Sequence, residues 1–161
     1  LIEGDEFRLN ATVSPDNATN KNLIWKSGNP EVASVADGLV TALKPGRTTI
    51  SVTTEDGDKT ASCEVVISAR VYPVTEVSLN KSSIELIEGE QQQLTAIVSP
   101  DNATNKAVVW TVDDSAAADD VTISQEGVLS VPADATVDSI TVTATSVYDS
   151  TKTGTATITV A

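Results

Sequence analysis

The stretch Ser-Pro-Asp-Asn-Ala-Thr-Asn-Lys at residues 14–21 returns letter for letter at residues 99–106. The serines that start the two copies, Ser14 and Ser99, are 85 positions apart. An identical stretch of this length at a fixed distance indicates that one structural unit is present twice in the chain. The repeat therefore predicts the organisation of the protein before any other pattern is considered.

The similarity between the two copies extends well beyond these eight residues. The further matches are residues 1–4 with 86–89, Trp25 with Trp110, 37–40 with 126–129, 50–53 with 140–143, and 59–60 with 152–153. Their spacing grows from 85 positions before the tryptophan to 93 at the last pair. The second copy therefore carries short insertions, and we expect them in loops, which tolerate added length at little entropic cost.

Apolar and polar residues alternate along several segments, which is typical of half-buried strands. The clearest of these segments are residues 7–13, 61–68 and 153–160. Turn signals lie between them, for instance at Asp37-Gly38 and Pro45-Gly46. This pattern predicts an all-β sandwich or barrel, in which only residues 113–119 are suited to a short helical turn.

Charge and composition argue against several classes of function. The chain has 10 Lys and Arg against 23 Asp and Glu, a net charge of −13, which repels nucleic acid phosphates and anionic lipid surfaces. No apolar run approaches the roughly 20 residues that span a bilayer. The chain also has no histidine, which excludes Ser-His and Cys-His nucleophile pairs. We therefore expect no nucleic acid binding, no membrane insertion and no enzymatic activity.

The order of the segments carries a resemblance to a known family. The segments are 77–89, the strand and corner at 94–106, the tryptophan strand, and residues 27–33, 38–42 and 45–50. Together they resemble the bacterial immunoglobulin-like domain of group 2. The resemblance implies two tandem immunoglobulin-like β-sandwiches, at residues 1–70 and 74–161. The second copy departs from the pattern at 113–120 and at 131–134, which puts its loop shapes in question.

The first copy opens later in the module than the second. Leu1 is the equivalent of Leu86, so residues 74–85 have no counterpart in the first copy. We interpret this as a fragment boundary inside a module and predict a first domain that lacks its initial strand. Unpaired sheet edges recruit other strands, so restoring the strand is expected to raise that domain's melting temperature.

The core is predicted around the two tryptophans. Trp25 and Trp110 recur at the repeat period on the inward phase of a strand. Cys63 aligns with Ala156 on the inward side of the last strand and is predicted to be a small buried residue; a reactive thiol or an intermolecular bridge is the alternative, since a lone cysteine cannot form an intrachain disulfide. Phe7 is predicted to lie at the edge of the same core.

Two candidate ligand sites follow from residue type. Carboxylates cluster in one loop of the second domain, and such hard oxygen ligands suit calcium; they are Asp113, Asp114, Asp119 and Asp120. Plain surface acidity is the alternative. Tyr148 is the one aromatic residue with no predicted structural role, and it is a candidate for stacking on a sugar ring. A single aromatic makes a poor platform in a chain that is 3% aromatic.

By resemblance, such modules occur in bacterial surface proteins, adhesins, phage structural proteins and secreted glycan-degrading enzymes, mostly as non-catalytic parts. The short junction at residues 69–73, stiffened by Pro73, favours a semi-rigid spacer. We therefore expect a monomeric part of a longer bacterial cell-surface or extracellular protein, without a cofactor apart from calcium. The alternatives are adhesion to a host or partner surface protein or glycan, a carbohydrate-binding accessory module, and a phage decoration domain.

Overall fold

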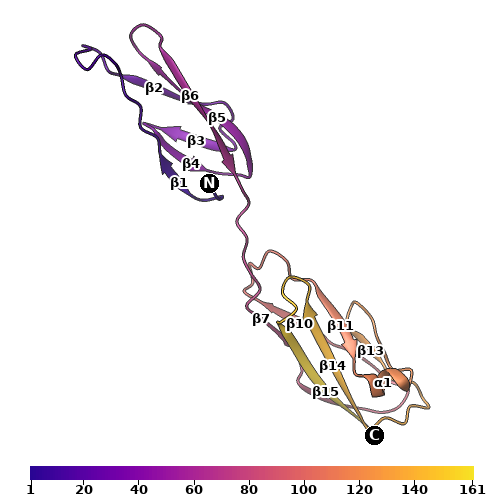
Figure 1. Ribbon diagram of the computed structural model, residues 1–161. Coiled ribbons are helices and arrows are strands. Elements are labelled where there is room, and N and C mark those ends of the chain that lie inside the picture. The colour runs from indigo at the N-terminus through magenta and orange to yellow at the C-terminus, as the bar shows by residue number, and fades with distance from the viewer. The chain divides into compact units, whose positions relative to one another are not determined.

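The computed structural model describes all residues 1–161 and divides into two compact units, Leu1–Arg70 (unit 1) and Val71–Ala161 (unit 2). The regular structure of each unit is almost entirely β-strand, as Figure 1 shows, and every strand ladder except the parallel pair of β8 and β15 is antiparallel. The two tandem β-sandwiches expected from the sequence are therefore present. The single helix has five residues, and no helix is long and apolar enough to cross a membrane.

Unit 1 contains two three-stranded sheets. Its strands are β1 (Glu6–Arg8), β2 (Leu23–Ser27), β3 (Ala33–Ala36), β4 (Leu39–Ala42), β5 (Gly46–Thr54) and β6 (Thr60–Ile67). One sheet has the order β1-β4-β3 and the other the order β2-β5-β6. The sheets enclose a small core of Ala33, Val40, Ala42, Ile50 and Ile67.

Unit 2 repeats these six strands and adds three more. Its elements are β7 (Glu76–Leu79), β8 (Ser83–Leu86), β9 (Gln91–Gln93), β10 (Ala96–Ser99), β11 (Val108–Val112), α1 (Asp114–Ala118), β12 (Thr122–Ile123), β13 (Val128–Ser130), β14 (Ser139–Ser146) and β15 (Thr153–Val160). The sheet orders are β10-β7, β11-β14-β15-β8 and β12-β13-β9. The additional strands β7, β8 and β10 are therefore what distinguishes unit 2 from unit 1.

The alternation of residues 153–160 produces the expected inward face in unit 2. Gly154, Ala156 and Ile158 are buried on β15, while the threonines between them are exposed. Ile158 lies opposite Ile140 of β14, and both are fully buried. The core of unit 2 is larger than that of unit 1 and includes Trp110, which is 6% exposed. Trp25 is only half-buried, although it packs against the core of unit 1.

The strand ladders correct one part of the repeat alignment. Trp25 pairs with Val52, whereas Trp110 pairs with Ala144, so β5 and β14 correspond at a distance of 92 positions. The match of 50–53 with 140–143 was therefore wrong by two residues. Both segments alternate Ile or Val with Ser or Thr, and a shift of two keeps every side chain on its face. The pattern alone could not tell these two alignments apart.

The single strand predicted at residues 7–13 is also wrong. In unit 2 the equivalent segment is split, because β9 pairs with β13 while β10 pairs with β7 in a different sheet. In unit 1 the first part forms β1 against β4. Residues 9–13 form no strand, since unit 1 contains no counterpart of β7 to pair with them.

Two residues predicted to lie in the core of unit 1 are exposed. Cys63 is an exposed free cysteine, although its counterpart Ala156 is 1% exposed. Phe7 is 52% exposed on the edge strand β1. Both side chains have the inward phase that the pattern assigned to them. They are uncovered because no strand of unit 1 lies over this part of the sheet.

Candidate functional site

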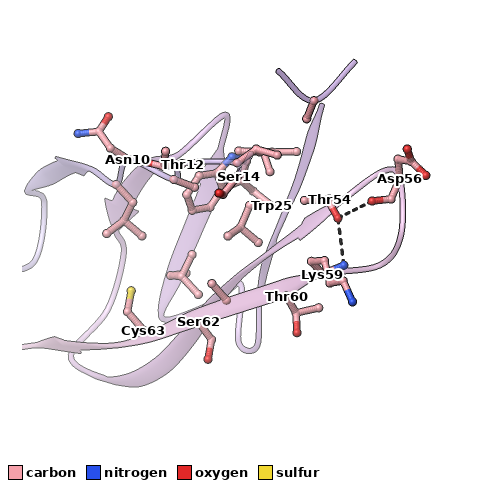
Figure 2. Close-up of a pocket in the computed structure, with 18 of the residues that line it drawn as sticks. Asn10, Thr12, Ser14, Trp25, Thr54, Asp56, Lys59, Thr60, Ser62 and Cys63 are labelled. Carbon is pink, nitrogen blue, oxygen red and sulfur yellow. Dashed lines mark hydrogen bonds between the residues drawn. The ribbon is translucent and has the colours of Figure 1, made fainter. Parts of the chain in front are cut away.

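A groove of about 530 Å³ opens in unit 1. Figure 2 shows residues 10–14 along one side and the first half of β6 along the other. Cys63 points toward the segment that carries Asn10, while its neighbour Ser62 points away from it. Trp25 lines the groove between these two sides.

The lining of the groove combines apolar and polar side chains. Leu23, Trp25, Ile50 and Val52 supply the apolar part from β2 and β5. The polar lining residues are Asn10, Thr12, Ser14, Asn20, Thr54, Asp56, Lys59, Thr60 and Ser62. Such a mixed lining is suited to burying apolar side chains and to hydrogen bonding.

A tight turn closes one end of the groove. The Thr54 hydroxyl donates a hydrogen bond of 2.8 Å to the backbone carbonyl of Asp56 and accepts one of 3.0 Å from the Lys59 amide (Figure 2). The turn therefore holds the start of β6 at a fixed place beside β5. Sequence reasoning predicted an exposed sheet edge in unit 1 but missed this groove. The signal that could have found it was the absence of a counterpart to residues 74–85.

The acidic loop of unit 2 is built around Asp113, which caps helix α1. Its carboxylate accepts hydrogen bonds from the Ser115 hydroxyl at 2.6 Å and the Ala116 amide at 3.0 Å, and a further one from the Thr141 amide. These donors favour the ionised form. The hydrogen bond from Ser115 is the largest cause, and together they lower the pKa of Asp113 from 3.8 to about 2.

Asp119, at the other end of α1, has a similar structural role. Its carboxylate accepts hydrogen bonds from the Thr136 amide and hydroxyl and from the Val137 amide, the last at 2.8 Å. The bond from the Thr136 amide is the main reason that the pKa of Asp119 lies below its ordinary value. No group of three or more acidic side chains in the chain is placed to hold a metal ion. The structure thus does not bring Asp113, Asp114, Asp119 and Asp120 together around a common point.

The low pKa of Asp113 predicts a specific loss of stability in acid. The carboxylate is favoured in the fold, so its contribution is complete above the unfolded pKa near 4 and is lost as the pH falls through about 2. The variant Asp113→Asn is expected to lose about 1 kcal/mol at pH 7, since an amide cannot accept all three hydrogen bonds. Its unfolding free energy should also fall less steeply between pH 4 and 2. Urea unfolding at a series of pH values measures both effects. Equal slopes for the variant and the parent would contradict this role.

Tyr148 is exposed, at 43%, in the hairpin between β14 and β15. Its amide donates to the Ser146 hydroxyl at 3.1 Å, which fixes the backbone of the hairpin. The neighbouring Val147 is 55% exposed. The hairpin therefore presents one aromatic and one aliphatic side chain to solvent, a small apolar surface without a second ring.

Comparison with known proteins agrees with the division into units. The family model described as the bacterial Ig-like domain (group 2) matches the chain twice, at residues 1–65 and 73–156. Each match lies within one unit. The resemblance seen in the order of the segments is therefore confirmed for both copies.

Several curated proteins are similar to this chain over part of their length. An alpha-L-arabinofuranosidase of Bifidobacterium longum is 33% identical over 71% of the chain, which is 11% of that protein. An Ig-like virion protein of Serratia phage KSP90 is 36% identical over 71% of the chain, which is 45% of that protein. An S-layer protein of Bacillus licheniformis is 26% identical over 62% of the chain, which is 12% of that protein. The chain spans less than half the length of each.

Proposed function

The chain belongs to the family of bacterial Ig-like domains of group 2, and from this premise we propose that it is a non-catalytic, semi-rigid spacer within a larger cell-surface or extracellular protein. The observation that carries the proposal is the double match of the family model, one to each unit. Two copies of one small sandwich in series lengthen a protein without adding a different kind of binding surface.

The similar proteins support this proposal by their variety. Their names describe an enzyme, a virion protein and an S-layer protein, and this chain matches only a part of each. A module that is shared among proteins with such different names is better explained by a mechanical role than by one common ligand. The S-layer and virion names favour a location at a surface. The negative charge of −13 suits a solvated stalk.

The residues on each side of the junction are hydrogen-bonded within their own unit. On the unit 1 side, the Arg70 guanidinium donates to the Glu3 carbonyl at 2.9 Å and to the Asp5 carboxylate at 2.8 Å. On the unit 2 side, the Tyr72 amide donates to the Thr104 hydroxyl at 2.7 Å, and the Thr104 amide donates back to the Tyr72 carbonyl at 3.0 Å.

Only one residue therefore separates Arg70, which is held by unit 1, from Tyr72, which is held by unit 2. Pro73 follows and fixes its own backbone φ angle. For the proposed spacer we therefore expect a junction with few free dihedral angles.

We expect that removing these contacts loosens the junction. The double variant Arg70→Ala, Thr104→Val loses the Arg70 side-chain contacts and the hydrogen bond from the Tyr72 amide, and it keeps the backbone bond from the Thr104 amide. The matched control is Thr19→Val, because Thr19 is the equivalent of Thr104 in unit 1 and makes no hydrogen bond through its side chain. Arg70, Thr104 and Thr19 are all exposed, so we expect the two sandwiches to remain folded in the double variant and in the control.

The measurement is the distribution of distances between spin labels, one on each unit, by pulsed electron resonance. Labels at Glu31→Cys and Asp134→Cys, in a Cys63→Ala background, are placed on exposed loops. The parent chain is expected to give a narrow distribution that broadens at least about twofold in the double variant and stays narrow in the control. A parent distribution as broad as that of the double variant would contradict the spacer proposal.

A recognition role is the second candidate, favoured by the exposed pair Val147 and Tyr148. Such a module would bind a glycan or a surface protein through this hairpin. A screen of the whole chain against glycans and extracellular-matrix proteins, with and without calcium, tests it. Binding that is lost in Tyr148→Ala would favour recognition, whereas a blank screen would leave the spacer role.

A further inference from the structure

Strand β11 is an edge of the four-stranded sheet of unit 2. The sheet order is β11-β14-β15-β8, so one side of β11 pairs with β14 and the other side pairs with no strand. An unpaired side carries N–H and C=O groups that can accept a further strand, and proteins often protect it with a charged side chain or a proline. The sequence of β11, Val-Val-Trp-Thr-Val at residues 108–112, has neither.

The hydrogen bonds to β14 and its hairpin show which backbone groups of β11 face the open side. The Asp113 amide donates to the Thr141 carbonyl at 3.1 Å, and the Val147 amide donates to the Ala107 carbonyl at 2.9 Å. In an antiparallel ladder every second residue directs both of its backbone groups to the same neighbour. The odd-numbered residues of β11 therefore face β14, and the even-numbered ones face the open side. These even-numbered residues are Val108, Trp110 and Val112.

The equivalent edge of unit 1 is protected. β2 is likewise an outer strand of its sheet. It carries the exposed Lys26 at the position that Thr111 has in unit 2, 85 residues later. A lysine there opposes pairing, because a second strand would remove water from its charge and bring the Lys26 of a second copy close to it. The uncharged open edge is therefore a property of unit 2 alone.

Two copies of β11 can pair with each other in an antiparallel register centred on Trp110. In this register Trp110 lies opposite Trp110 of the second copy, and Val108 lies opposite Val112. These are the residues whose backbone groups face the open side, so each pair can exchange two hydrogen bonds. A shift by one residue would instead place these groups against residues that already bond β14. The backbone thus favours this pairing over a shift by one residue.

The exposed side chains also fit this register. Val109, which is 45% exposed, lies opposite Thr111 of the second copy on each side of the two-fold axis, and β-branched side chains pair well across strands.

Charges are complementary just beyond the strand. Lys106 lies opposite Asp114 of the second copy in the same register. Both side chains are exposed, and the ion pairs of the chain all lie in unit 1. The same register between two β2 strands would place Lys21 opposite Asn29, which offers no carboxylate. The charge complementarity is therefore specific to unit 2.

We propose that the open edge of β11 is an interface between two copies of this chain, in which the two β11 strands pair antiparallel about Trp110. The two four-stranded sheets then form one continuous sheet of eight strands, which is within the usual size of open sheets. The inference does not depend on the spacer role, since it concerns the association of two chains and not the junction within one chain. The distance measurement on the junction and the association measurement below can fail independently.

The interface is small, and the net charge of −13 on each copy opposes association. We therefore expect a weak dimer, with a dissociation constant of about 100 μM at about 0.15 M salt.

Unit 1 supplies the variant that tests the interface. Thr111→Lys places on β11 the lysine that β2 carries at the equivalent position, so the sandwich is expected to tolerate it. The matched control is Thr155→Lys on β15. Thr111 lies opposite Thr143, and Thr143 lies opposite Thr155, so the control makes the same substitution in the same row of the sheet, away from the edge. Circular dichroism establishes that both variants are folded.

Sedimentation equilibrium of the whole chain measures the dissociation constant, with a reductant present so that Cys63 cannot link two copies. We expect the constant to rise at least about tenfold in Thr111→Lys and to stay near the parent value in Thr155→Lys. Lys106→Asp should also weaken the dimer, and adding Asp114→Lys should restore it, because the exchanged charges again lie opposite each other.

Amide hydrogen exchange locates the interface within β11. The amides of Val108, Trp110 and Val112 should exchange more slowly as the protein concentration rises. The amides of Val109 and Thr111 already bond β14 in a single copy, so their exchange should depend little on concentration.

Three outcomes would overturn the proposal. The first is a parent chain that stays monomeric at a concentration of about 1 mM, ten times the expected dissociation constant. The second is association that Thr111→Lys leaves unchanged, or that Thr155→Lys weakens equally. The third is a dimer in which the exchange of the Val108, Trp110 and Val112 amides does not slow with concentration, which would mean that another surface joins the copies.

Discussion

Replacing Gly127 with alanine should destabilise unit 2 by about 3 kcal/mol, from backbone strain and steric overlap together. Gly127 has a φ of +83°, which favours glycine. A Cβ atom there would lie 2.5 Å from the carbonyl oxygen of Leu94 and 3.0 Å from the Trp110 ring. The Leu94 amide also donates to the Gly127 carbonyl at 2.9 Å, so neither backbone segment can move without breaking this bond.

Gly57 offers a matched control for this prediction. It has a similar φ of +77°, but a Cβ atom there would meet nothing within 4 Å. Gly57→Ala should therefore cost only about 1 kcal/mol, from backbone strain alone. Urea unfolding of unit 2, which contains Gly127, can be followed by Trp110 fluorescence in a Trp25→Phe background. Unfolding of unit 1, which contains Gly57, can be followed by Trp25 fluorescence in a Trp110→Phe background. A loss below 1 kcal/mol for Gly127→Ala would show that the close approach to Leu94 and Trp110 is not real.

The second large effect is expected at Ile158, where alanine should cost unit 2 about 3 to 4 kcal/mol. Ile158 is fully buried, with Ile140 of β14 opposite on one side and Ile84 of β8 on the other. Removing three carbon atoms leaves a cavity that strands on both sides cannot easily close. The equivalent position in unit 1 is Val65, which is only half-buried.

The comparison with Val65 tests whether the loss of stability depends on how fully the truncated apolar side chain is buried. Val65→Ala should cost about 1 kcal/mol, because that side chain is already partly hydrated and lacks a neighbour like β8. Ile158→Val, which removes a single methylene, should cost about 1 kcal/mol in unit 2. Urea titrations followed by Trp110 fluorescence measure the two Ile158 variants, and titrations followed by Trp25 fluorescence in a Trp110→Phe background measure Val65→Ala. Similar losses at Ile158 and Val65 on truncation to alanine would contradict the difference in enclosure between the two units.

Much of the fold could be predicted because its determinants are local or repeated. The identical corners at 14–21 and 99–106 reveal two copies, and the alternation at 153–160 places Ala156 and Ile158 on the inward face. The helical turn suggested at 113–119 is the place of α1, where Asp113 caps the first turn. These features depend on residues that are close in the chain, or on a pattern that occurs twice.

The errors share a different physical origin. Cys63 and Phe7 have the inward phase, yet whether they are buried depends on a strand from elsewhere in the chain. The alternating pattern reports only the side of the sheet on which a residue lies. It does not report what covers that side. For the same reason the pattern of 7–13 could not show that its second half requires a partner in the other sheet.

The acidic residues show a similar limit. A run of carboxylates in a loop suggests a cation, but Asp113 and Asp119 accept hydrogen bonds from backbone amides at the two ends of α1. In the sequence, a carboxylate that caps a helix looks the same as a carboxylate that binds a metal ion. Only the distances between the carboxylates and the nearby amides distinguish the two roles.

The chain contains the same sandwich twice, with a strand β7 in unit 2 and no counterpart of that strand in unit 1. Amide hydrogen exchange of the 161-residue chain tests this difference. Residues 96–99, which pair with β7, should exchange at least about a hundredfold more slowly than residues 11–14. Equal protection of the two segments would contradict the claim, since it would mean that residues 11–14 are already paired.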